Sequence, residues 1–90
     1  MIHVEAIDDE TFRVTVDKQT STTHTVTLQR AYYDKLTAGR VDAETLIRKS
    51  FEFLLEREPN TSILRSFDLP VIGHYFPDYE ATIKKALERV

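Results

Sequence analysis

The chain of 90 residues has the length of one small domain, with 41% hydrophobic residues, 30% charged residues and a net charge of −3. These values are typical of a globular protein, and the acidic balance does not favour a general nucleic-acid binder, which usually carries a basic stripe. Cysteine is absent, which excludes disulfides, thiolate metal sites and thiol nucleophiles.

The first third of the chain predicts three β-strands. Apolar and polar residues alternate in residues 2–6, 12–17 and 22–28, with short polar stretches between them. A period of two is typical of a strand with one buried face, and short links between consecutive strands favour an antiparallel meander. The face that we expect to be buried holds Phe12, Val14, Val16, His24, Val26 and Leu28, and the other face holds Thr15, Thr23, Thr25 and Thr27.

Two helical patterns follow. The first begins near Gln29 and ends where Gly39 supplies a left-handed residue. The second begins at Asp42, whose side chain can cap a helix, and ends at about Glu58, because Pro59 cannot continue it. The apolar face of this second helix is about 200° wide, which is broader than the usual stripe. We therefore expect the sheet to cover one part of it, and a further helix or a partner chain to cover the rest.

The last third of the chain predicts shorter elements. Asn60 is expected to cap a short helical turn, and residues 69–73 are apolar and form either a strand or a buried loop. Pro77 is expected at the first position of a final helix, which proline favours. The apolar stripe of that helix would hold Tyr79, Ile83, Ala86, Leu87 and Val90. The sequence thus predicts a single α+β domain over residues 1–90: a three-stranded antiparallel meander followed by three or four helices on one face.

The sequence offers little catalytic chemistry. Two glycines are too few for a phosphate-binding loop, no serine stands in a nucleophile elbow, and the three histidines lie too far apart for a zinc-site spacing. We therefore expect no enzyme activity, no metal and no cofactor. No apolar run is long enough to span a membrane, and the N-terminal residues do not resemble a signal peptide, so we expect a cytoplasmic protein without a membrane partner.

Three groups of polar residues are candidates for an interaction site, each with a structural alternative. His74, Tyr75, Asp78 and Tyr79 lie close together near a helix start and could form a small polar site; alternatively, the aromatic rings pack the last helix onto the core. The threonine face is either a binding surface or a solvated strand face. His24 is either a buried switch or ligand, or a core histidine with a satisfied hydrogen bond.

Residues 23–57 resemble the ribbon-helix-helix family of dimeric repressors and antitoxins. The resemblance rests on the strand Thr23-His24-Thr25-Val26-Thr27-Leu28, the short helix with Tyr32, Tyr33 and Leu36, and the helix that begins Asp42-Ala43-Glu44-Thr45-Leu46-Ile47. It implies that two chains pair their strands into a ribbon that enters the major groove of DNA. Thr23, Thr25 and Thr27 would then face bases, and Asp42 with the following amides would face a phosphate.

The sequence favours a small non-catalytic module that acts by protein–protein contact as a homodimer, with another protein as a further partner. The reasons are the missing catalytic chemistry, the acidic balance and the surplus apolar surface of the second helix. The alternative is a ribbon-helix-helix-like DNA-binding regulator or antitoxin. The residues singled out for interaction are Thr23, Thr25, Thr27, His74, Tyr75, Asp78 and Tyr79.

Overall fold

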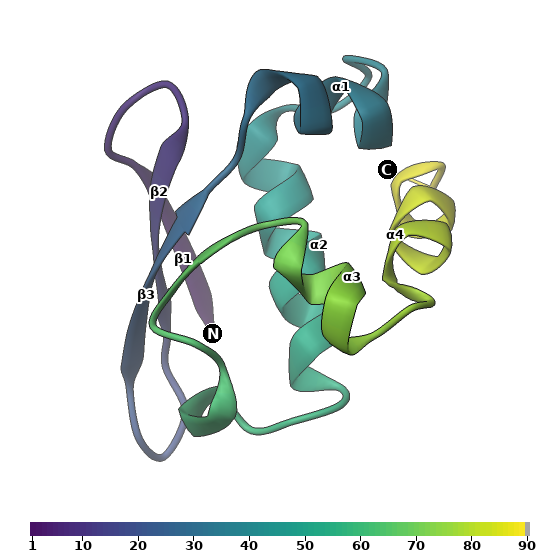
Figure 1. Ribbon diagram of the computed structural model, residues 1–90. Coiled ribbons are helices and arrows are strands. Elements are labelled where there is room, and N and C mark those ends of the chain that lie inside the picture. The colour runs from purple at the N-terminus through teal and green to yellow at the C-terminus, as the bar shows by residue number, and fades with distance from the viewer. Residues whose placement is uncertain (90) are drawn as a thin grey trace.

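The computed structural model describes residues 1–89, which form an α+β fold with one sheet and a layer of helices (Figure 1). The strands β1 (Ile2–Ala6), β2 (Thr11–Val16), β3 (Thr22–Thr27) and β4 (Ser66–Asp68) lie in the order β1-β2-β3-β4. The first three form the predicted antiparallel meander, and β4 joins the other side of β3 in parallel.

Four helices and one 3₁₀ turn lie on one side of the sheet (Figure 1). They are α1 (Arg30–Thr37), α2 (Ala43–Leu55), η1 (Asn60–Ser62), α3 (Val71–Tyr75) and α4 (Tyr79–Leu87). Asp42 caps α2 as predicted, because the backbone N–H of Thr45 donates to its Oδ1 at 2.8 Å. Hydrogen bonding from the Thr45 side chain, and next from this backbone N–H, holds the pKa of Asp42 below its usual value.

The core lies between the sheet and the helices. The strand residues predicted to face inward are buried, and they meet the apolar faces of the helices; the largest fully buried side chains include Tyr79, Phe51, Leu46, Ile47, Leu69 and Ile83. The opposite face of the sheet is open, with exposed His3, Glu5, Arg13 and Thr23. Since helices cover one face only, the expectation of helices packed on the apolar face is confirmed.

The helix α2 lies between the sheet and α4, with contacts to β1 on one side and to α4 on the other. The broad apolar face predicted for α2 is therefore covered within one chain: the sheet covers one part of it, and α4 covers the other. The apolar surface that favoured a homodimer is covered by α4.

Several predicted elements of the last third differ from the structure. The fourth strand is Ser66–Asp68, whereas residues 69–73, for which a strand or a loop was expected, run into α3. Asn60 does not cap a helix; it opens η1, and its side chain binds the β2–β3 turn instead. α4 begins at Tyr79 and not at Pro77, because Pro77 lies in the preceding turn. Val90, expected on the stripe of this helix, lies outside the described residues.

Within residues 1–89, no helix combines the length and the apolar character needed to cross a membrane.

Candidate functional site

The structure places the three predicted threonines on the open face of the sheet. Thr23 is exposed, and Thr25 and Thr27 are half-buried there. Their strand is interior, however: β3 pairs with β2 along one side and with β4 along the other. The ribbon implied by the resemblance needs β3 to pair with its own copy, and in this fold both sides of β3 are already used.

The predicted cluster near the last helix is dispersed over three environments. His74 is exposed on α3, and Tyr75 is 67% exposed beside it. Asp78 is exposed and accepts from the Arg57 guanidinium at 3.2 Å, which ties the turn before α4 to the end of α2. Tyr79 is fully buried, so it cannot join a surface site with His74 and Asp78.

Tyr79 is a core residue whose hydroxyl is satisfied by α2. Its oxygen lies 2.6 Å from the Ser50 Oγ, and Ser50 in turn donates to the Leu46 carbonyl at 2.8 Å. Burial raises the pKa of the Tyr79 phenol above its usual value. The structural alternative stated for this residue, packing of the last helix onto the core, is the one observed.

A half-buried phenol, Tyr32, joins α1 to α4. Tyr32 donates to the Glu80 carboxylate at 2.8 Å, and Lys35 lies 3.3 Å from the same carboxylate. The bond from Tyr32 is the main reason that the pKa of Glu80 is lowered, while burial raises the pKa of Tyr32. No group of three or more histidine or carboxylate side chains within residues 1–89 is arranged to hold a metal ion.

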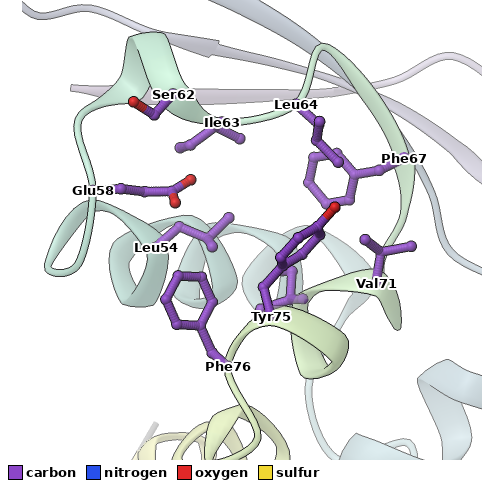
Figure 2. A pocket seen from close by; sticks show the side chains of 10 residues that line it. Leu54, Glu58, Ser62, Ile63, Leu64, Phe67, Val71, Tyr75 and Phe76 are labelled. Atoms are coloured by element: carbon purple, nitrogen blue, oxygen red, sulfur yellow. The ribbon is translucent and has the colours of Figure 1, made fainter.

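An apolar groove lies at the β4 side of the molecule. It lies between the end of α2, the segment from η1 to β4, and α3, and has a volume of about 170 Å³. Figure 2 shows Tyr75 and Val71 at one end of the hollow and Glu58 and Ser62 at the other. The groove is lined by Leu54, Glu58, Ser62, Ile63, Leu64, Phe67, Val71, Ile72, Tyr75 and Phe76.

The buried side chains of His24 and Asn60 hold the wall formed by residues 60–65 against β3 and the β2–β3 turn. The Nδ1 of His24 lies 2.8 Å from the Leu64 carbonyl, and its Nε2 lies 2.9 Å from the Thr22 hydroxyl. Because a carbonyl only accepts, Nδ1 carries the proton of this bond. The Asn60 amide donates to the same Thr22 hydroxyl at 3.0 Å and to the Thr20 carbonyl at 2.7 Å.

His24 is therefore a satisfied core histidine that fixes one rim of the groove. It is 1% exposed, and its ring packs against Phe51 with 5.5 Å between the ring centroids. The alternation of β3 predicted its inward direction, but its partner in the Leu64 backbone comes from forty residues further along the chain.

Glu58 is the charged residue of the groove. It is half-buried, and none of the ion pairs within residues 1–89 includes it. Its neighbour Arg57 turns away, stacks on Phe53 and binds Asp78. The groove thus combines an apolar floor with one carboxylate at its end.

Sequence reasoning singled out Tyr75 but missed Leu64 and Glu58. The short helical turn expected after Asn60 was taken to carry Leu64, whereas the 3₁₀ turn ends at Ser62 and Leu64 is 46% exposed. The available signal was Pro59 followed by a polar run, which favours an irregular segment over a helix.

Comparison with protein-family models, with curated proteins and with solved structures finds no match to this chain.

Proposed function

We propose that this domain is a non-catalytic protein-interaction module, which acts as a homodimer and docks a segment of another protein in the apolar groove. The observation that supports docking in the groove is the exposure of Leu64 and Tyr75, at 46% and 67%, beside a hollow that residues 1–89 leave unfilled. Exposed apolar groups that surround a hollow are typical of interaction sites.

The size of the groove suits one apolar side chain. A cavity of about 150 Å³ lined by apolar residues accepts a benzene ring, and the groove has about 170 Å³. Pockets for drug-sized ligands are larger, with about 300–1,000 Å³. A leucine, methionine or phenylalanine of a partner therefore fits the groove better than a cofactor does.

The charge of the groove favours a basic neighbour for that side chain. The Glu58 carboxylate lies at the end of the hollow, among Leu54, Ser62 and Ile63 (Figure 2). A half-buried carboxylate attracts a cation more strongly than an exposed one does, because less water screens it. The expected partner segment is a peptide with one apolar anchor and a lysine or arginine beside it.

The proposal is tested by selection from a displayed library of random peptides, followed by affinity measurements on the selected sequences. The selected peptides should share an apolar residue next to a basic one. Leu64→Ser should weaken their binding about tenfold, the loss expected when one apolar anchor contact is removed. The matched control is Ile7→Ser, because Ile7 is equally exposed, at 47%, and lies in the β1–β2 turn, away from the groove.

Glu58→Gln separates the charge of the groove from its shape. It should weaken binding of the basic peptides at low salt and have a smaller effect at high salt, since salt screens the ion pair. The proposal is overturned if the selected peptides share no sequence, or if they bind the Leu64→Ser variant as tightly as they bind the wild type. The alternative, a DNA-binding regulator, gains support only if the protein shifts a mixed DNA pool at low salt with a steep salt dependence.

A further inference from the structure

We propose that the homodimer forms through the outer edge of β1, where two copies pair antiparallel about Val4 and join their sheets into one. This interface rests on the homodimer of the proposed function and identifies where it forms. It leaves the groove free, because β1 and β4 are the two opposite edges of the sheet.

The outer edge of β1 presents unpaired backbone groups. β1 is the first strand of the sheet, and no strand within residues 1–89 pairs with its outer side. Met1 and Asp17 exchange two backbone bonds, of 2.7 and 2.8 Å. Because bonded and outward residues alternate along an antiparallel strand, Ile2, Val4 and Ala6 direct their N–H and C=O groups outward. Such an edge is a template for pairing, whereas β4, with only three residues, is a poor one.

A two-fold axis at Val4 gives the longest ladder that this edge allows. Val4 then lies opposite the partner's Val4 as a hydrogen-bonded pair, and Ile2 lies opposite the partner's Ala6. These three residues point toward the helix side of the sheet, where Ile2 and Val4 are half-buried against the core. The apolar layer of one copy would therefore continue into that of the other.

The charges on the open face select this register. With the axis at Val4, His3 lies opposite the partner's Glu5, and this pair occurs twice. His3 already lies 3.3 Å from Asp17, and Glu5 lies 3.0 Å from Arg13. Acidic and basic groups would thus alternate across the interface. A shift of the partner by two residues places either Glu5 opposite Glu5 or His3 opposite His3 and shortens the ladder.

One side chain already contacts the edge. Arg48 of α2 donates to the Ile2 carbonyl at 2.5 Å. A carbonyl oxygen accepts two bonds, so this contact does not prevent a bond from the partner's Ala6. The outward groups of Val4 and Ala6 are bonded by no group described in residues 1–89.

The test is light scattering on a sizing column, over a range of concentrations, with charge variants that exclude homodimers but allow heterodimers. Glu5→Lys places lysine opposite the partner's His3, and His3→Glu places glutamate opposite the partner's Glu5, so each variant alone should self-associate about tenfold more weakly. In an equimolar mixture the introduced lysine lies opposite the introduced glutamate, and His3 lies opposite the partner's Glu5 as in wild type, so the mixture should form dimers. Circular dichroism checks that each variant is folded.

A variant that alters the backbone of β1 tests the same interface without changing a charged side chain. Val4→Pro removes the outward N–H and no bond of the intrachain ladder, so it should give monomers, whereas the control Val4→Thr keeps the N–H and should give dimers. Wild type that stays monomeric at every concentration would overturn the homodimer itself. Wild-type dimers that persist in Val4→Pro and in both charge variants would overturn only the β1 interface and leave the homodimer standing.

Discussion

The hydrogen bond between Ser50 and Tyr79 gives the sharpest stability prediction, because the direction of each bond is determined. Ser50 has one hydroxyl proton and donates it to the Leu46 carbonyl, so the Tyr79 hydroxyl donates to Ser50. Ser50→Ala would leave the buried phenol without an acceptor. Tyr79→Phe would leave Ser50 with its bond to Leu46 intact.

The expected magnitudes follow from this asymmetry. An unsatisfied buried polar group costs about 1–3 kcal/mol, whereas a lost hydrogen bond without an orphaned partner costs about 1 kcal/mol. We expect Ser50→Ala to lower the free energy of unfolding by about 2 kcal/mol and Tyr79→Phe by about 1 kcal/mol. In the Ser50→Ala background, Tyr79→Phe should raise the free energy of unfolding, since it removes the orphaned hydroxyl.

Urea unfolding of the wild type, the two single variants and the double variant measures this cycle. Equal m-values across the four proteins are needed for the comparison. If Tyr79→Phe lowers the free energy of unfolding by the same amount in both backgrounds, the two hydroxyls are not coupled and the reasoning is wrong.

Three further predictions concern pH and the groove wall. Because burial raises the pKa of Tyr79, the phenol of the unfolded chain loses its proton at a lower pH than that of the folded protein. The free energy of unfolding should therefore fall as the pH rises above about 10. Tyr79→Phe should reduce this fall in urea titrations at pH 9 to 11. Asp42→Ala should cost about 1 kcal/mol at pH 7, and Asp42→Asn should cost less, because its amide oxygen can still accept from the Thr45 N–H. Because the pKa of Asp42 is lowered in the folded state, this cost should be present above about pH 4 and shrink as the pH falls further; a cost independent of pH would contradict the role of its charge. His24→Leu should leave the Leu64 carbonyl without its donor and lower the free energy of unfolding by about 2 kcal/mol. Amide hydrogen exchange should accelerate in residues 60–68. Unchanged exchange there would mean that His24 does not hold the groove wall.

Most of the first two thirds of the fold was predictable from local patterns. Strict alternation located β2 and β3 and the side that faces the core, and Asp42 located the start of α2. These signals work because period and capping are properties of a few neighbouring residues. The same reasoning placed the end of α1 at Gly39, and the structure has Ala38 as well as Gly39 in the left-handed region, with φ of 52° and 74°.

The last third and the groove were not predictable in the same way. β4 has three residues and alternates over too short a length to be recognised, and it is a strand because β3 offers it a free side. Leu64 is exposed because His24 and Asn60 hold its segment against the sheet, a contact between distant parts of the chain. For Tyr79, the apolar stripe correctly indicated burial, and that burial removes Tyr79 from the polar cluster in which it was also placed.

The parallel pairing of β3 with β4 has a consequence for the order of folding. The meander closes through short turns, whereas β4 reaches β3 only after residues 28–65 have been arranged, which is a long loop to close. We expect the meander to form early and the groove walls late, and the same segment to open first in the native state. A peptide that contacts Leu64 on one wall and Tyr75 on the other would then stabilise the closed groove and reduce the local opening of the region that it binds.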